Sequence, residues 1–492
     1  MNSTKHLLSV IIFIIALLIC QCVSGQSNVV VILADDLDLE LDGTSPLSKT
    51  RQLIAKEGAV FKNMYVTDAH NCPSRASLLS GMYAHNHGVI NNSVSGGCSS
   101  QQWREKWERL TIANLLPEYK TFFSGVYLDE YGKNEGGGTY IPEGWKHWKA
   151  LVGGSAYYNY TLVDNGTPVF HYDEYSVDYF TDVVKNESVE FIKEVSAPFF
   201  MLIAPPACGA PFVSAPQYQS HFEKAKAPRT KSYNVPGKDK HWLVANVVHP
   251  MSNESVYLTD SILRKRWRTL LSLDDLVEAV VHELSAQSLL DNTYIFFTSD
   301  SGYHLGQFGL PNGNRQLYEF DTHVPLFVRG PTITAGTTIA KPVLTIDLAP
   351  TIVALANGIL PSNMDGKPFL SKSSDHKVVK TREKFLILHH GEGHRYRINN
   401  CKQSTMNQTC CLPSCVCEDS FNNSYSCVRS ISSSLNTVYC EFSDNVAFVE
   451  LYDLSKDPFQ LKNIASSANS TELLKYHNWL IELAMCKGTT CL

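Results

Sequence analysis

Hydrophobic positions in this chain follow two patterns that alternate along the sequence. Short apolar runs rich in β-branched and aromatic residues predict buried strands at Asn28–Ala34, Thr121–Val126, Phe199–Ala204, Thr293–Thr298 and Val324–Val328. Longer segments with helical periodicity predict helices at Ser48–Glu57, Arg109–Leu116, Val177–Val195 and Asp260–Leu289, and a further helix is expected to open at Ser74–Ser80. This alternation is typical of an α/β fold, in which a mostly parallel sheet is covered by helices.

The character of the chain changes after a polar break at Ser371–Asp375. Beyond it lie an apolar run at Phe385–Leu388, a cysteine-rich segment, a second apolar run at Ala447–Asp453 and a predicted last helix at Thr471–Met485. With 492 residues, the chain is longer than one hydrophobic core usually supports. We therefore expect a main α/β domain over residues 26–375 and a smaller C-terminal subdomain over residues 376–492, which carries a disulfide-rich loop.

The first 25 residues have the layout of a secretory signal peptide. A short polar start is followed by the apolar run Leu7–Cys20 and by Val23–Gly25, near which cleavage is expected. A membrane anchor is the alternative, but the run is shorter than the ~20 residues that a spanning helix needs. No other long apolar run follows, so we expect no membrane span after signal removal.

The cysteines and the glycosylation acceptors also indicate a protein of the secretory pathway. Seven of the 14 cysteines lie between Cys401 and Cys440, and Cys486 and Cys491 lie near the C-terminus. In an oxidising compartment this density of cysteines indicates disulfide bonds, whose pairing the sequence leaves open. A zinc site is the alternative. Glycan acceptors of the form Asn-x-Ser/Thr follow the signal segment at Asn91, Asn159, Asn165, Asn186, Asn253, Asn407, Asn422 and Asn469. We expect a glycoprotein of the secretory pathway, delivered to the lysosome or to the extracellular space.

The charge distribution bears on possible partners. The net charge is −6, and no basic run stands out. Nucleic acids and acidic membrane surfaces are bound through clustered Lys and Arg side chains. Neither is therefore expected as a partner.

Acidic residues follow two of the predicted strands. Asp35 and Asp36 come directly after the first strand, and Asp300 follows the strand that begins at Thr293. Open α/β sheets bind ligands at the carboxyl ends of their strands, and carboxylate oxygens are suitable ligands for a hard divalent cation. Helix capping and solvated turns are the alternative for such residues. The two strand ends together favour a metal site.

Several motifs resemble the sulfatase family. The stretch Asn71–Gly81 is similar to the family's active-site motif, which reads Cys or Ser, any residue, Pro, Ser, Arg. Near the C-terminus, Leu451–Leu454 with Asp457, Pro458 and Asn463 matches a second family pattern. Further stretches resemble the N-acetylglucosamine-6-sulfatases within the family, at His85–His87, Phe122–Gly125, Glu130–Gly132, Lys240–Leu243, Lys265–Trp267, Gln316–Asp321 and Cys415–Asp419. The resemblance spans nearly the whole mature chain.

The resemblance implies an alkaline-phosphatase-like fold, with a mixed, mostly parallel sheet between helices and a smaller C-terminal α+β subdomain. In the family, the first motif residue is oxidised to formylglycine, whose hydrate attacks the sulfur of a sulfate ester, and a calcium ion polarises the reacting oxygens. The resemblance puts Asp35, Asp36 and Asp300 at calcium positions, and Arg75 where the motif arginine orients the nucleophile. Ser301 stands where the family has Asn or His, so calcium is expected to bind a weakened site.

Four further positions depart from the family pattern. Asn71 occupies the nucleophile position, and an amide can neither be oxidised to an aldehyde nor act as an effective oxygen nucleophile. Val126 and Asn314 stand where the family has sulfate-binding lysines, and Gly209 replaces a histidine that serves the leaving group. Formylglycine is therefore not expected, and the combined loss predicts a site that is impaired or inactive in sulfate-ester hydrolysis.

Three hypotheses on function follow. The first is an inactive sulfatase-like glycoprotein that binds a glycosaminoglycan or another sulfated glycan in the former active-site cleft, with binding of another protein as the alternative. The second is an active sulfuric ester hydrolase that removes 6-sulfate from N-acetylglucosamine units of glycosaminoglycans, which requires that the motif register or the formylglycine rule does not hold here. Arg315, Cys208 and His304 are candidates for replacing other missing groups, but none of them replaces a formylglycine. The third is a related phosphoester hydrolase, whose candidate hydroxyl Ser74 is instead expected to cap a helix.

Overall fold

The computed structural model describes residues 26–133, 137–371, 382–392 and 420–491, together with the backbone of residues 402–403 and 408–409. The expected signal segment, the expected boundary at residues 375 and 376, most of the cysteine-rich loop and the acceptor Asn407 lie outside the described residues.

The main sheet has 11 strands. They are β1 (Asn28–Ala34), β2 (Ala59–Tyr65), β3 (Lys120–Gly125), β4 (His147–Leu151), β5 (Tyr160–Asp164), β6 (Thr167–His171), β7 (Phe199–Ala204), β8 (Thr293–Ser299), β9 (His323–Arg329), β10 (Thr337–Ile339) and β11 (Val343–Leu344). Across the sheet the order is β10-β2-β9-β8-β1-β7-β3-β4-β5-β6, and β11 pairs with β2. The central block from β8 to β4 is parallel, whereas β9 and β5 run antiparallel to their neighbours.

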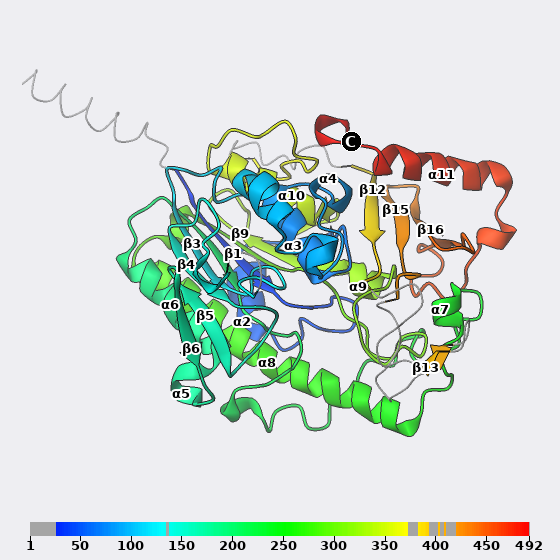
Figure 1. Cartoon of the computed structure of the whole chain (residues 1–492), viewed down its shortest axis with the longest axis horizontal. Helices are drawn as coiled ribbons and strands as arrows, with labels where there is room; N and C mark the ends of the chain where they lie inside the picture. Colours follow the sequence, from blue (N-terminus) through cyan, green and yellow to red (C-terminus); the bar gives the residue numbers. More distant parts are fainter. Residues whose placement is uncertain are drawn as a thin grey trace, which may run out of the picture.

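Helices cover both faces of this sheet (Figure 1). The α-helices are α2 (Ser48–Thr50), α3 (Asn71–Ser80), α4 (Ala84–His87), α5 (Tyr175–Asp178), α6 (Phe180–Glu194), α7 (Trp242–Ala245), α8 (Asn253–Ala286), α9 (Glu319–Thr322), α10 (Thr345–Leu355) and α11 (Ser470–Ala484). Val29 and Val31 of β1 share a core with α3 and α10, while Val30 and Ile32 face the core that contains α6 and α8. Because successive side chains of a strand point to opposite faces, a strand buried on both faces must be apolar throughout.

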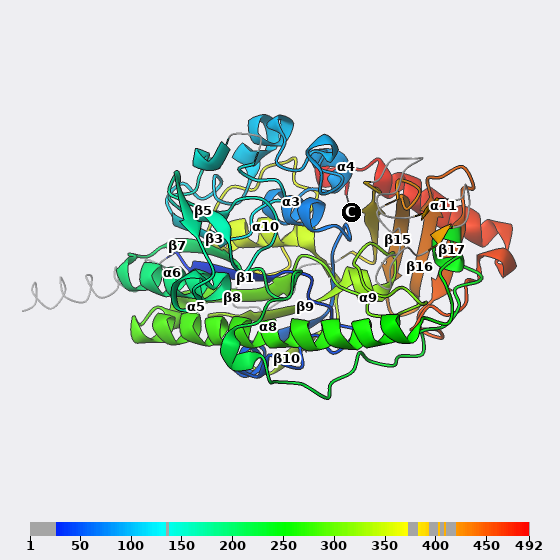
Figure 2. The same cartoon turned by 60° about the horizontal axis from the view of Figure 1, so that its bottom comes forward.

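A second, antiparallel sheet lies beside the main one, and its strands run in the order β12-β15-β16-β17. These strands are β12 (Lys384–His389), β15 (Tyr425–Ile431), β16 (Asn436–Phe442) and β17 (Val449–Asp453), and a separate short pair is formed by β13 (Lys402–Gln403) and β14 (Gln408–Thr409). Helix α11 runs along this sheet (Figure 2). A disulfide joins Cys427 to Cys440 across β15 and β16.

The strand predictions are confirmed by β1, β3, β7, β8 and β9, each to within one residue at either end. The helix predicted at Arg109–Leu116 is wrong, because only Glu108–Leu110 forms a short 3-10 turn. The segment is short for a stable helix, and the following Pro117 disfavours helical geometry in Leu116.

Other boundaries also differ from the sequence predictions. The helix expected to open at Ser74 begins at Asn71, and the long helix expected from Asp260 begins at Asn253. The helix predicted at Val177–Val195 is divided at Tyr179, whose backbone is extended.

The sequence patterns also missed several elements. Polar Lys62 and Asn63 interrupt the apolar pattern of β2, and the edge strand β6 is almost entirely exposed. Helix α10 contains Pro350, which disfavours a helix prediction although the segment is buried.

Candidate active site

Three buried aspartates meet at the carboxyl ends of two adjacent parallel strands. Asp35 and Asp36 follow β1, Asp300 follows β8, and one carboxylate oxygen from each lies within 4.8 Å of the others. The backbone N–H of Asp36 also donates to Asp300 Oδ1 at 3.0 Å. The structure thus brings together the three aspartates that the sequence predicted as metal ligands.

Arg75, from the second turn of α3, is a cation that contacts two of these carboxylates. Its Nε donates to Asp300 Oδ2 at 2.7 Å, and its Nη2 lies 3.3 Å from Asp35 Oδ1. A third donor, Nη1, reaches the backbone oxygen of Val126. Burial, followed by repulsion from Asp300, raises the pKa of Asp36 to about 6 and the pKa of Asp35 well above its usual range. Even with Arg266 at the backbone oxygen of Asp36, these cations leave the three carboxylates with excess negative charge.

Asn71, the first residue of α3, points its amide into the same group. Its Nδ2 lies 3.0 Å from Asp35 Oδ1, 2.8 Å from Asp36 Oδ1 and 3.2 Å from Asp300 Oδ2. The Asn314 amide adds donors to Asp36 Oδ1 at 2.7 Å and to Asn71 Oδ1 at 3.0 Å. The amide nitrogen of Asn71 thus occupies the point on which the three carboxylates converge.

The donor set fits a calcium ion. Buried carboxylates require pairing or a metal, and calcium prefers six to eight hard oxygen ligands. Rotation about the last torsion of Asn71 or Asn314 would exchange its amide nitrogen for an oxygen. Calcium would therefore be held by Asp35, Asp36 and Asp300, with these amide oxygens as further ligands.

Ser301 stays a predicted metal position. It is buried next to Asp300, and its hydroxyl lies 2.9 Å from the backbone oxygen of Ala69 and 3.0 Å from that of Gly302. These backbone contacts occupy the hydroxyl proton. Ser155, which the sequence did not suggest, donates its hydroxyl to Asp35 Oδ2.

Two of the predicted site positions provide no functional group. Val126 is buried in the apolar core on one face of the sheet. At Gly209, an added Cβ atom would lie 2.4 Å from Asp35 Oδ2. A side chain at position 209 is therefore incompatible with the present position of the Asp35 carboxylate.

The residues considered as replacements for the missing groups have other roles. Cys208 is buried, its thiol lies 3.7 Å from the backbone oxygen of Asp36, and burial raises the thiol pKa to about 12. His304 is buried against Asp321, with Nδ1 2.9 Å from Oδ2. Arg315 lies 3.8 Å from Glu392 in a neighbouring cleft.

The hydroxyl and thiol nearest to Asn71 in the sequence, those of Ser74 and Cys72, also belong to α3. Ser74 lies inside α3, and His70 is the N-cap residue, so the predicted capping role of Ser74 is wrong. Cys72 forms a disulfide with Cys98. Its sulfur is therefore not available as a nucleophile.

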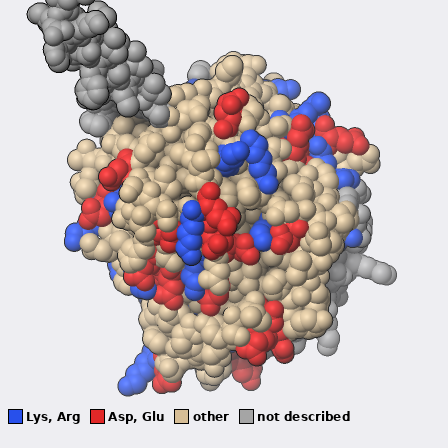
Figure 3. Space-filling view, turned by 90° about the vertical axis from the view of Figure 1, so that its left-hand side faces the viewer, with Lys and Arg blue, Asp and Glu red and all other residues tan. Residues whose placement is uncertain are grey.

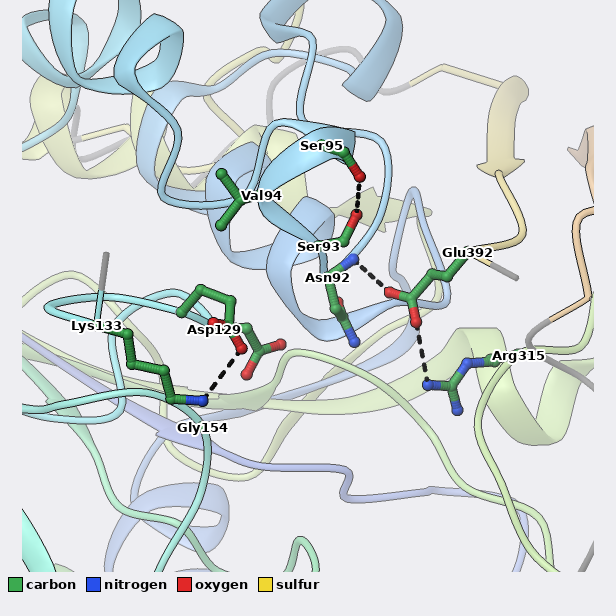
Figure 4. Close-up of a pocket in the computed structure, with 10 residues that line it drawn as sticks. Asn92, Ser93, Val94, Ser95, Asp129, Lys133, Gly154, Arg315 and Glu392 are labelled. Carbon is green, nitrogen blue, oxygen red and sulfur yellow. Dashed lines mark hydrogen bonds and ion pairs between the residues drawn. The ribbon is translucent and has the colours of Figure 1, made fainter. Parts of the chain in front are cut away.

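A cleft of about 650 Å³ adjoins the head of α3 (Figure 4). Its lining residues are Asn92, Ser93, Val94, Ser95, Asp129, Glu130, Lys133, Gly154, Arg315 and Glu392. Asn92 connects the cleft to α3, because its Oδ1 accepts from the backbone N–H of Cys72 at 3.0 Å. No single sequence pattern indicated this lining, since it comes from five separated segments of the chain.

The described glycan acceptors differ in exposure. Asn159, Asn165, Asn186, Asn253 and Asn469 are exposed, and Asn422 is half-buried. In contrast, Asn91 is 8% exposed, and its Oδ1 accepts from Ser93. Exposure favours the first five as carriers of glycans.

Three disulfides in the described part of the chain indicate folding in the secretory pathway. They join Cys72 to Cys98, Cys427 to Cys440 and Cys486 to Cys491. Among the described residues, no helix has the length and apolar character needed to cross a membrane.

Known proteins resemble this chain over most of its length. A family model described as Sulfatase matches residues 27–359. The N-acetylglucosamine-6-sulfatase of Capra hircus is 47% identical over 475 residues, which cover 95% of this chain and 85% of that relative. The N-acetylglucosamine-6-sulfatase of Homo sapiens is 46% identical over 473 residues, which cover 95% of this chain and 86% of that relative.

Solved structures share the fold at lower sequence identity. A protein in complex with its substrate D-glucosamine-2-N,6-O-disulfate has a TM-score of 0.73 at 20% identity, covering 94% of this chain and 97% of that chain. A phosphonate monoester hydrolase from Silicibacter pomeroyi has a TM-score of 0.68 at 19% identity, covering 93% and 94%. The architecture is thus the expected alkaline-phosphatase-like one, a mixed, mostly parallel sheet between helices with a separate small antiparallel sheet. From the family model and the two mammalian relatives, the chain belongs to the sulfatase family.

Proposed function

We propose that this protein is a calcium-binding sulfatase-family glycoprotein that does not hydrolyse sulfate esters and binds a glycan in the cleft beside α3. One observation carries the proposal: the Asn71 amide stands at the head of α3, hydrogen-bonded to Asp35, Asp36 and Asp300. This is the position of the family's nucleophile.

The surrounding groups support loss of the reaction. An amide nitrogen has no lone pair suited to attack, and Asn71 lacks a group that can become an aldehyde. Val126 and Gly209 supply neither a cation for the sulfate oxygens nor an acid for the leaving alcohol. Loss of one such donor typically costs roughly a hundred- to a thousand-fold in rate. Arg75 alone does not replace them, because its donors already engage Asp300, Asp35 and the Val126 carbonyl.

Calcium would neutralise the aspartates and offer open positions to ligand oxygens. Rearrangement of the Asn71 amide would make room for it. The proposed ion therefore has a binding role at this site.

The cleft favours a hydroxyl-rich sugar of low sulfation. Lys133 and Arg315 face the carboxylates Asp129, Glu130 and Glu392, so acidic groups outnumber basic ones. On the face shown in Figure 3, basic and acidic side chains are interspersed. A long polyanion would instead need clustered basic groups. We propose a glycan with a terminal glucosamine-type unit as the ligand, met in the lysosome or outside the cell.

An active 6-sulfatase is the second candidate. The names of the mammalian relatives favour it, together with the intact Arg75 and the three aspartates. This candidate would require a nucleophile other than Asn71. The neighbouring Cys72 cannot provide it, because its sulfur is held in a disulfide.

Turnover distinguishes the two candidates. Secreted protein is assayed with calcium on a fluorogenic 6-sulfo-N-acetylglucosaminide, and the peptide that contains residue 71 is weighed by mass spectrometry. We expect an unmodified Asn71 and turnover equal to the enzyme-free blank. Turnover that disappears in an Arg75→Ala variant would overturn the proposal.

A restored nucleophile gives a second test. Asn71→Cys re-creates the family motif with Pro73, Ser74 and Arg75. We expect the aldehyde mass at residue 71 but little turnover, because Val126, Gly209 and Asn314 are unchanged. Turnover comparable to that of an active family member would contradict this.

Binding is tested by calorimetry with N-acetylglucosamine-terminated oligosaccharides, with and without 6-sulfate. We expect the wild type to bind these oligosaccharides and Arg315→Ala to weaken the binding. Lys462→Ala, which changes an exposed lysine outside the cleft, should bind like the wild type. Equal affinity in both variants would show that the cleft is not the binding site.

A further inference from the structure

A second cluster of metal-binding side chains lies apart from the three aspartates. Asp68, His70 and His389 are fully buried, and one ligand atom from each lies within 4.8 Å of the others. Asp68 Oδ1 is 3.7 Å from Nδ1 of His70 and 3.7 Å from Nδ1 of His389. The two imidazole rings are stacked, with centroids 4.1 Å apart.

Five of the six side-chain polar atoms of this cluster lack hydrogen bonds. Among the described residues, both ring nitrogens of His70, both of His389 and Oδ2 of Asp68 have no hydrogen-bond partner. Buried polar groups are nearly always satisfied, and each unpaired one costs about 1–3 kcal/mol. Five such atoms at one place indicate that a polar or charged partner is missing here, and the two Nδ1 atoms face Asp68 Oδ1.

The charge of the cluster also indicates a cation. Asp68 Oδ1 accepts from the backbone N–H of His70 at 2.9 Å, but no Lys or Arg of the described chain forms an ion pair with this carboxylate. A buried carboxylate without a cation is costly, whereas a metal ion would compensate it. Water could satisfy some of the hydrogen bonds, but it would not supply this charge.

The donor types identify the class of metal. Two imidazoles and one carboxylate suit zinc and related first-row transition ions, whereas calcium prefers oxygen donors. Tetrahedral zinc ligands lie about 3.3 Å from one another. The two separations of 3.7 Å would therefore have to shorten by only a few tenths of an ångström.

Glu392 lies where it can orient the imidazole ring of His70. Its Oε1 lies 3.8 Å from Nε2 of His70, on the side of the ring away from Asp68. Metal-bound histidines commonly direct their second ring nitrogen to a carboxylate, which holds the ring in position. Glu392 also accepts from the backbone N–H of Asn92 and lines the cleft (Figure 4).

From this juxtaposition we infer that Asp68, His70 and His389 bind a zinc-type divalent ion through Oδ1 and the two Nδ1 atoms, with Glu392 positioning His70. The site joins the two sheets. Asp68 and His70 belong to the connection from β2 to α3, and His389 ends β12. The backbones already meet here, since the N–H of Leu388 donates to the Thr67 oxygen at 2.9 Å. A fourth ligand position would remain for water or a small ligand.

The test uses the full secreted chain without a histidine tag, stripped with a chelator and then titrated with zinc chloride. We expect one tightly bound zinc ion per chain in addition to the calcium site, and a rise in the unfolding temperature on loading. His70→Asn and His389→Gln should each weaken zinc binding about a hundred-fold or more, and Glu392→Gln about ten- to a hundred-fold. His282→Gln, at an exposed histidine of α8, should bind like the wild type.

Two further measurements keep the inference independent of the proposed function. Asp300→Asn should lose calcium binding but keep zinc binding, and cobalt(II) loaded into the wild type should show visible absorption bands that His389→Gln abolishes. If the wild-type protein binds no zinc, the inference is overturned, and water is the partner of the polar atoms in this cluster. Zinc binding that persists in both histidine variants, each checked for native folding by circular dichroism without metal, would also overturn the inference.

Discussion

Gly209 shows how the absence of a side chain shapes the three-aspartate group. The space that a Cβ atom would need is filled by the Asp35 carboxylate, which Arg75, Asn71 and Ser155 hold in place. The loss of the side chain and the position of the aspartate are therefore linked.

We expect Gly209→Ala to displace this carboxylate. Calcium affinity should fall about ten-fold or more, and the free energy of unfolding should fall by about 1–3 kcal/mol, the usual cost of overpacking. Calorimetric calcium titration and urea unfolding measure the two effects. Gly138→Ala is the control, because its Cβ atom would meet Pro168 at an ordinary 3.4 Å. Wild-type calcium affinity in Gly209→Ala would contradict the prediction.

His87 gives a pH dependence at the same scale. Nδ1 accepts from the backbone N–H of Val89 at 3.1 Å, and Nε2 lies 3.0 Å from Ser77 Oγ, so the neutral ring is fully paired. Burial, followed by repulsion from His85, lowers the pKa of His87 to about 3.

The folded state therefore binds fewer protons than the unfolded state, whose histidine pKa is about 6.5. The contribution of His87 to stability is complete above about pH 6.5 and is lost as the pH falls towards 3, at up to about 1.4 kcal/mol per pH unit. NMR titration, with the signal assigned from a His87→Gln variant, should show a neutral imidazole at about pH 5. An imidazole that titrates near 6.5 would refute this.

At the scale of elements, the head of α3 is held by a covalent link as well as by hydrogen bonds. Cys72 is bonded to Cys98, 26 residues along the chain, and its N–H is capped by Asn92. This anchoring fixes where Asn71 and Arg75 meet the strand ends.

Removal of this disulfide in Cys72→Ala/Cys98→Ala should cost about 3–4 kcal/mol of unfolding free energy by the loop-entropy relation. It should also weaken calcium binding, because α3 carries two of the site residues. The control Cys486→Ala/Cys491→Ala removes a disulfide with a sequence separation of 5. The same relation gives a loss of about 2 kcal/mol for this control, and we expect its calcium affinity to be unchanged. Urea unfolding and calcium titration check both variants; an equal loss of calcium affinity in the control would contradict the role of α3.

At the scale of the whole molecule, buried ionic contacts join the two sheets. Arg429 of β15 donates its Nε to Glu319 Oε1 of α9 at 2.9 Å, and the Tyr65 hydroxyl of β2 donates to Glu319 Oε2 at 2.7 Å. Arg429, acting against burial, lowers the pKa of Glu319. The two sheets are thus expected to unfold together.

Arg429→Met should therefore cost about 3–5 kcal/mol, since it leaves the Glu319 carboxylate buried and unpaired. Arg429→Met/Glu319→Gln should lose less, because the buried charge is removed as well. Urea unfolding of the wild type, both single variants and the double variant measures the coupling. Additive losses in the double variant would show that the contact is not energetically coupled.

The sequence alone determined the central strands and the approach of the three aspartates. Strands such as β1 and β8 are buried on both faces, so their composition is apolar throughout and easily detected. Parallel neighbours end at one edge, which brings Asp35, Asp36 and Asp300 together. The family motif likewise predicts Asn71 and Arg75 at one site.

Features that depend on contacts between distant segments follow from the folded chain and not from local sequence patterns. Glu392 faces His70, and His389 faces Asp68, although more than 300 residues separate the partners in each pair. No local periodicity records such contacts, because they arise from the docking of one sheet beside another. In the same way, the start of α3 at Asn71 and the buried helix with Pro350 were decided by packing, which outweighs local propensity.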